Sequence, residues 1–251
     1  MTDDVPSTVS DAQSASFRAE ARAVGAGRGW DWIVEAFALF RLQPGMWILM
    51  VVVLGVLFVL MSMIPVLGSL ASALLLPIFG AGLMLGCRAL DREGTLEMSH
   101  LFAGFKEKTG NLVMIGVFNL VGWAVMAIAV IAVVGGGVFM GAMRGGSIGA
   151  GMSIVSVLIA GLLVAALSVP LYMATWFAPA LVVLHGVAPV DALKASFFAC
   201  LRNWIPFTVY SVVLLVLGLL AAIPLGLGYL ALLPVLAASI YTAYRDLFRA
   251  V

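Results

Sequence analysis

Charged side chains are scarce in this sequence. It has 13 Lys and Arg and 12 Asp and Glu in 251 residues, and hydrophobic residues make up 64% of the chain. A soluble domain has about 25% charged residues and is nearer half apolar. There are too few polar side chains here to cover a water-facing exterior, so we predict that lipid surrounds most of the protein. The net charge of +1 also excludes the concentrated basic face that nucleic acid requires.

Cysteine and histidine are nearly absent. Two cysteines are too few for a disulfide framework, and the two histidines offer little for nucleophilic catalysis. No G-x-S-x-G, H-E-x-x-H or P-loop motif occurs. We therefore expect no enzyme, no cofactor and no metal. A metal site near one membrane face is the alternative, but its donors fit no standard ligand spacing: Cys87, Glu97, His100, His185 and Cys200.

Long runs without any charge or histidine dominate the rest of the chain. Each is long enough to cross ~30 Å of hydrocarbon as a helix, and none shows the alternation of a β-barrel strand. The fourth is too long for one straight crossing, so we expect Pro170 and Pro179 to kink it, or its first turns to leave the membrane. The six predicted spans are Met46–Pro65, Val66–Cys87, Leu112–Val134, Ser153–Leu184, Ile205–Ile223 and Leu225–Tyr244.

The distribution of cations predicts the orientation. Six spans place 12 of the 13 Lys and Arg on one side and Arg144 on the other. By the positive-inside rule both termini are cytoplasmic. Residues 1–27 are polar and have no apolar signal-peptide core, so we predict a disordered cytoplasmic tail before a single transmembrane domain over 28–251.

One hexad occurs three times before an apolar run: "AFALFR" (36–41), "LFAGFK" (101–106) and "FFACLR" (197–202). Each lies in a segment with helical spacing of apolar residues and charged flanks. These segments are either helices lying in the membrane interface, which we favour, or helices packed on the end of the bundle.

A second similarity links the two ends of the chain. "IPVLGSLASALLLP" (64–77) resembles "IPLGLGYLALLP" (223–234), and Arg-x-Leu-x-Arg follows both, as "RALDR" and "RDLFR". We therefore predict an all-α integral membrane protein with six transmembrane helices. They form three parallel repeats of an interfacial helix plus a two-helix hairpin, over approximately 28–92, 95–186 and 188–249.

The middle repeat departs from this plan. Residues 135–151, "GGGVFMGAMRGGSIGAG", contain eight glycines. Glycines four residues apart permit close helix contact, but glycine is a poor helix former outside lipid. We favour a non-cytoplasmic loop here.

The middle repeat also carries a group of polar and aromatic residues that we expect near the middle of the membrane. Asn119 and Trp123 are i, i+4 on the third span, and Tyr172 and Trp176 are i, i+4 on the fourth. Tryptophan prefers membrane interfaces, so its position near the midplane requires a reason. Either Asn119 forms an interhelical hydrogen bond and the indoles fill the core, or the four residues line a ligand pocket.

Two arginine pairs stand at the cytoplasmic ends of spans. Arg88 with Arg92, and Arg245 with Arg249, serve as topology anchors in the simpler interpretation. The alternative is an anionic headgroup site, because two guanidinium groups one turn apart can bind a phosphate.

Three stretches resemble an uncharacterised family of proteobacterial inner-membrane proteins: "GRGWDWIVEAFALFRLQPGMWIL", "IPVLGSLASALL" and "CRALDREGTLEMSHLFAGFKEKTG". More loosely, the threefold plan is similar to the membrane domain of some glycerophosphodiester phosphodiesterases. The resemblance implies a Gram-negative inner membrane and a six-helix fold, and it carries no catalytic residue.

Two functions remain open. The first is a non-catalytic membrane protein that binds membrane lipids or assists a membrane-protein partner. The second is a facilitator or exporter of a hydrophobic or lipid-like solute. The spans carry scattered Ser, Thr and Asn rather than a polar stripe, so we favour the first.

Overall fold

The described part of the chain is helical. The computed structural model describes residues 21–248, without the side chains of Glu93 and 146–153, and no strand occurs in that range. Helices satisfy all their backbone groups internally, as a chain in lipid requires. The helices are α2 (Arg28–Leu42), α3 (Pro44–Ser62), α4 (Leu67–Glu93), α5 (Met98–Leu101), the 3₁₀ helix η1 (Ala103–Phe105), α6 (Thr109–Arg144), α7 (Gly146–Thr175), α8 (Ala178–His185), α9 (Pro189–Arg202), α10 (Trp204–Ala222) and α11 (Tyr229–Phe248).

Short helices precede three of the long ones, at the three hexads. They are α2, the α5–η1 segment and α9. α2 buries Trp32, Ile33 and Phe40 while Trp30 and Phe37 remain about half exposed. It packs against α10 and α11. α2 therefore packs on the bundle, as one of the two interpretations expects, and it still presents aromatic rings to its surroundings.

Two hairpins have tight turns, as "Ile-Pro" predicted. α3 passes to α4 within 63–66, and α10 passes to α11 within 223–228. Val66 and Leu225, each directly after the proline, have positive φ of 63° and 54°. The helices then cross closely: a Cβ on Gly68 would lie 1.7 Å from the Met61 carbonyl oxygen, and one on Gly228 would lie 2.5 Å from Ala221 Cα. Both crossings require glycine.

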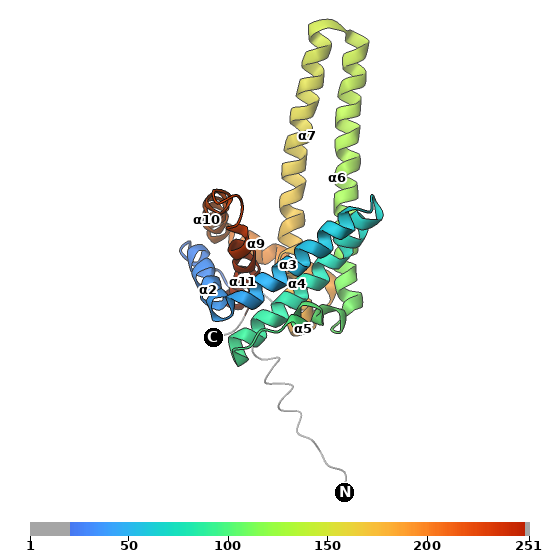
Figure 1. Cartoon of the computed structure of the whole chain (residues 1–251). Coiled ribbons are helices and arrows are strands. Elements are labelled where there is room, and N and C mark those ends of the chain that lie inside the picture. Colours follow the sequence, from blue (N-terminus) through green and yellow to red (C-terminus); the bar gives the residue numbers. More distant parts are fainter. Residues whose placement is uncertain (1–20, 249–251) are drawn as a thin grey trace.

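The middle hairpin, α6–α7, is far longer than the other two. α6 has 36 residues, and α3 has 19. At 1.5 Å per residue these are about 54 Å and 29 Å. Figure 1 shows α6 and α7 extending well beyond the ends of the other helices. The expected loop over 135–151 is wrong, because α6 continues through its glycines to Arg144 and the chain turns at Gly145, where φ is 60°. Gly141 is buried, so its missing side chain permits close packing.

The fourth predicted span is two helices rather than one kinked helix. α7 ends at Thr175 and α8 begins at Ala178. Pro179 causes this break, because its ring clashes with the carbonyl of residue 175. Ser196 on α9 satisfies backbone groups near the break: its hydroxyl accepts from Phe177 N at 3.0 Å and donates to the Met173 carbonyl at 2.7 Å. Pro170 stays inside the continuous α7.

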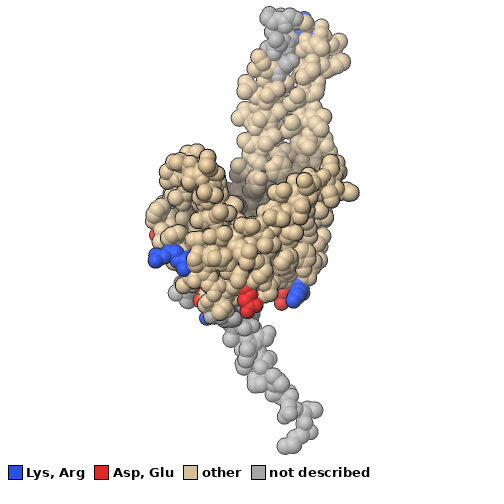
Figure 2. Space-filling model, viewed as in Figure 1, with Lys and Arg blue, Asp and Glu red and all other residues tan. Residues whose placement is uncertain are grey.

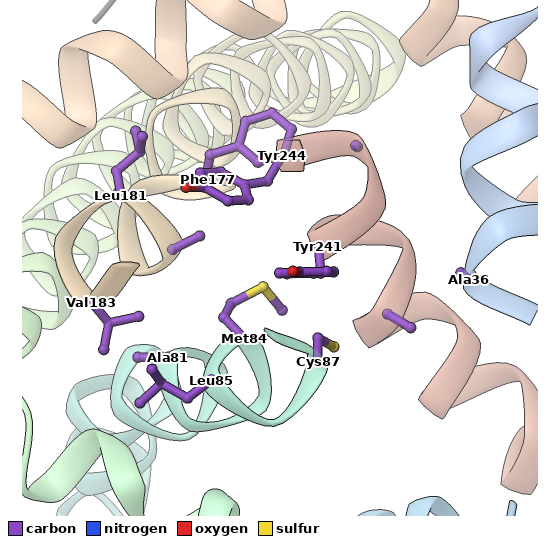
Figure 3. Packing of buried hydrophobic residues seen from close by; sticks show 14 of the residues in the cluster. Ala36, Ala81, Met84, Leu85, Cys87, Phe177, Leu181, Val183, Tyr241 and Tyr244 are labelled. Carbon is purple, nitrogen blue, oxygen red and sulfur yellow. The ribbon is translucent and has the colours of Figure 1, made fainter. Parts of the chain in front are cut away.

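Part of the buried core lies among α4, α8 and α11. Figure 3 shows Met84 of α4 beside Tyr241 of α11, with Phe177, which precedes α8, and Tyr244 close by. Phe177, Tyr241 and Tyr244 are fully buried. Each buried aromatic of this size removes about 150–250 Å² from solvent, so this cluster holds the first, second and third hairpins together.

Five helices of the described chain are long and apolar enough to cross a membrane. They cover Pro44–Ser62, Leu67–Arg92, Thr109–Arg144, Ile154–His185 and Trp204–Ala222. The sixth predicted span corresponds to α11, which is not among the helices that are long and apolar enough to cross a membrane. It begins at Tyr229, carries Arg245 and Asp246 in its last turn and buries most of that half inside the protein.

Candidate functional site

A cavity of about 510 Å³ lies between the three hairpins. Its walls are almost entirely apolar, and its size falls in the range of small-molecule and lipid-chain sites. Every hairpin contributes: Val51, Leu54, Gly55 and Phe58 from α3, Ala73, Leu76, Pro77, Phe79, Gly80, Leu83 and Met84 from α4, Ile115, Asn119, Tyr172, Thr175, Trp176, Pro179 and Ala180 from the middle repeat, and Leu233, Leu236, Ala237 and Ile240 from α11.

Three of the four predicted pocket residues line this central cavity. They are Asn119, Tyr172 and Trp176. The fourth, Trp123, is absent from the lining, but its ring makes an edge contact with Tyr172 at 6.0 Å between centroids. Residues from both helical pairs therefore meet at one wall of the cavity. Their helical spacing did not predict that the first and third hairpins complete the cavity.

Asn119 contributes an amide to this cavity, beside the hydroxyl-bearing Tyr172 and Thr175 and the indole of Trp176. The Asn119 side chain is half-buried, and no hydrogen bond joins it to another residue within 21–248. The interhelical hydrogen bond considered from the sequence is thus not formed with the described residues. An amide facing an apolar space without a partner is costly, and a ligand with a polar atom would relieve that cost.

A second apolar space, the α7–α10 groove, adjoins the cavity. It measures about 440 Å³, and Tyr172 and Trp176 line both spaces. Its other walls come from α7, α9 and α10: Val169, Met173, Cys200, Trp204, Phe207, Thr208, Tyr210, Ser211 and Val212. Burial raises the pKa of the Cys200 thiol to about 12, so this cysteine is a packing group rather than a nucleophile.

Ion pairs gather at the opposite end of the bundle from the α6–α7 turn. Figure 2 shows acidic and basic side chains toward the lower end of the visible face. Their centre is Asp246, which is 7% exposed. It accepts hydrogen bonds from Arg22, from Arg28 Nε at 2.7 Å and from Trp32 Nε1 at 2.8 Å. Burial opposes ionisation of Asp246, but hydrogen bonds from Arg28, Trp32 and Arg22 outweigh it and hold its pKa below 3.8.

Residues from the end of the expected disordered tail bind to this charged end of the bundle. Arg22 N donates to the Leu247 carbonyl at 3.0 Å, and Asn203 Oδ1 accepts from Val24 N at 2.9 Å. Residues 21–27 therefore lie fixed across α9–α11, although the sequence placed them in a disordered tail. Residues 1–20 lie outside the described range.

The arginine pairs differ from one another. Arg245 donates to Asp91 at 2.6 Å and to Glu35 at 3.0 Å, so its guanidinium group is held inside the protein. Arg88 is half-buried and Arg92 is exposed, and neither forms an ion pair with a side chain that the structure describes. Arg249 lies outside the described residues. The acidic partners of Arg245 were missed because both come from the first repeat, and the only signal for either was Asp91 inside "RALDR".

The candidate metal donors are not brought together. Within the described residues, no group of three or more His, Cys, Asp or Glu side chains could hold a metal ion. His100 has a local role instead, since its Nδ1 accepts a hydrogen bond from Glu97 N at 3.0 Å.

The helices, the charged end and the apolar cavity define an all-helical integral membrane protein. Comparison with known proteins gives 31% identity over 226 residues to a Burkholderia thailandensis protein named as a probable inner membrane protein. The match covers 87% of this chain and 82% of that protein, so the chain belongs to its family.

Family membership and the apolar helices indicate a multi-pass protein of the inner membrane. No family model and no solved structure matches the chain. The comparisons give no support to the looser resemblance to glycerophosphodiester phosphodiesterases.

Proposed function

We propose that this protein is a non-catalytic lipid-binding protein of the inner membrane, and that its central cavity holds a hydrocarbon chain. The observation that carries the proposal is the 510 Å³ cavity itself, with the unpartnered Asn119 amide in a largely apolar wall. An ester or carboxyl oxygen at the end of an acyl chain is the complementary group. Nothing at the cavity supplies a nucleophile with a base, so binding rather than turnover is the proposed activity.

The proposed arrangement in the membrane keeps both termini in the cytoplasm and keeps the three-repeat plan. The order of α2, α3 and α4 parallels that of α9, α10 and α11, and the first two helices of each set have 15 and 19 or 14 and 19 residues. In this plan α11 is the sixth crossing, sheltered from lipid by its neighbours. Because its neighbours cover it, α11 needs fewer apolar side chains than a helix that faces lipid.

The charged end then faces the cytoplasm, where Arg88 and Arg92 are proposed contacts for an anionic headgroup. They stand one turn apart near the end of α4, and no ion pair with the described side chains occupies them. Arg245 is not part of this proposed site, because Asp91 and Glu35 bind its guanidinium group.

Lipid retention tests the proposal. The protein is extracted in membrane nanodiscs, and bound lipid is measured by native mass spectrometry in the wild type, Asn119→Leu and Asn111→Leu. Asn111 is a matched control on the same helix that does not line the cavity. One lost hydrogen bond is worth about 0.5–1.5 kcal/mol, so we expect Asn119→Leu to reduce retention about five-fold.

The control should retain lipid like the wild type. Equal retention in all three proteins would show that Asn119 does not contact the ligand. A wild type that retains no lipid would contradict the proposed function.

A further inference from the structure

The α7–α10 groove and the central cavity share two lining side chains, Tyr172 and Trp176. We propose that the groove is a lateral portal through which an acyl chain of a membrane lipid passes from the bilayer into the cavity. This inference rests on the proposed function, since it supplies the route for the ligand of that cavity.

The groove is continuous with the lipid-facing surface. Val169 of α7 is 57% exposed and Val212 of α10 is 55% exposed, one on each wall of the groove. α10 packs mainly against α2 and α11, which leaves its side toward α7 open. Figure 2 shows a hollow between the lobe that contains α10 and the rest of the molecule. In a bilayer, hydrocarbon is the solvent at such an opening.

The position of the groove relative to the membrane interface indicates which part of a lipid enters it. Cys200 and Trp204 lie at one end, where α9 passes into α10, and Trp204 is 63% exposed. Tryptophan at a helix start marks the membrane interface. A lipid headgroup would stay at this level beside Trp204, while its chain lies along the apolar wall toward Tyr172. The lining has no charged side chain, so a chain fits the groove and a headgroup does not.

The two shared side chains stand where the helix is interrupted. Trp176 lies between the end of α7 at Thr175 and the start of α8, and Tyr172 lies one turn earlier. Their rings meet neighbours edge-on, Trp176 with Tyr210 at 6.3 Å and Tyr172 with Trp123 at 6.0 Å. Tyr172 is half exposed and Trp176 is half-buried, so neither ring is packed on every side. Rotation of these two rings therefore opens the wall at a small cost.

Exchange kinetics test the portal. Nanodiscs containing the loaded full-length protein are mixed with an excess of deuterated phospholipid of the same headgroup, and native mass spectrometry follows exchange of the bound lipid. Ser211→Trp fills the groove, and Val216→Trp is the control on α10, half exposed and outside the groove. We expect Ser211→Trp to slow exchange about ten-fold at unchanged final occupancy, and Val216→Trp to exchange like the wild type.

The outcomes separate the two ideas. Wild-type exchange in Ser211→Trp with normal occupancy would overturn the portal and leave the cavity proposal intact. Occupancy falling in proportion to the rate would also overturn it, because the groove would then be part of the binding site. A wild type without bound lipid would contradict both the portal and the proposed function. If Ser211→Trp does not fold, Val169→Trp fills the opposite wall, with Leu162→Trp as its control on α7.

Discussion

At the scale of single residues, Asp246 connects the two ends of the chain. Its carboxylate accepts hydrogen bonds from Arg22, Arg28 and Trp32, which lie at least 214 residues earlier in the sequence. The neighbouring Arg245 binds Asp91 and Glu35, and Tyr241 Oη also donates to Asp91 at 3.0 Å. Partners this numerous satisfy the buried carboxylate, and removal of its charge would weaken the hydrogen bonds from all three donors at once.

The first prediction concerns the stability that Asp246 provides. Asp246→Asn should destabilise the protein by about 3 kcal/mol, because the neutral amide loses hydrogen bonds to charged groups that are worth about 1.5–3 kcal/mol each. Thermal unfolding in detergent, followed by circular dichroism, measures the change. Asp31→Asn is the matched control: it pairs with the same Arg28 but is 47% exposed, so its loss should cost less than ~1 kcal/mol. Equal effects of the two variants would contradict a special role for Asp246.

The second prediction follows from the pKa of the same group. A pKa held below 3.8 in the folded state means that Asp246 stabilises the fold fully above that value. The contribution is lost as the pH falls below 3.8 through the lower folded pKa. Unfolding temperatures measured from pH 6 down to pH 2 should therefore fall more steeply for the wild type than for Asp246→Asn. Parallel curves would show that Asp246 does not titrate in this way.

At the scale of elements, glycine decides how closely helices approach. A Cβ on Gly29 would lie 2.2 Å from the Pro206 carbonyl oxygen and 2.9 Å from Tyr210 N, both in α10. Neither atom belongs to a flexible side chain that can move aside. α2 and α10 therefore pack backbone to backbone, which helps to hold the N-terminal helix against the third hairpin.

The third prediction tests this contact. Gly29→Ala should destabilise the protein by about 2 kcal/mol, because overpacking forces α2 and α10 apart. Gly27→Ala is the control, since a Cβ there meets nothing within 4 Å. Detergent melting of the two variants gives the comparison. An unchanged melting temperature for Gly29→Ala would mean that the two helices separate at no cost.

At the scale of the whole molecule, charge and apolar surface are divided between the two ends. The ion pairs of α2, α4 and α11 occupy one end, while Arg144 stands at the far end of α6. Both short hairpins turn without a charge. Such a division is the pattern that the positive-inside rule converts into an orientation.

The fourth prediction concerns this orientation. Reporter fusions at residue 147 should be periplasmic, and fusions at residues 95, 188 and 251 should be cytoplasmic. Alkaline phosphatase activity reports the first position and green fluorescence reports the others. A cytoplasmic reading at 147 would contradict the orientation, and a periplasmic reading at 251 would show that α11 does not cross the membrane.

The sequence by itself determined the helical class, the membrane environment and most helix positions. These follow from local properties: charge-free runs must be helical in lipid, and the residue before a proline disfavours helix, so α3 and α10 end before the Ile-Pro pairs at 64–65 and 223–224. Helical spacing pairs Asn119 with Trp123 on one helix and Tyr172 with Trp176 on the next, and three of these four residues line the central cavity. The expected loop over 135–151 failed because glycine propensities apply to water, whereas α6 packs against α7.

Only the tertiary structure decided what lies around each face. The cavity needs walls from three hairpins, and Asp246 meets partners from the start of the chain. Contacts of this kind depend on helix crossing angles and on close approaches at positions such as Gly29 and Gly68. A sequence pattern does not predict either of them. The same arginine motif therefore gave an ion-paired Arg245 in one repeat and an unpaired Arg88, among the described side chains, in another.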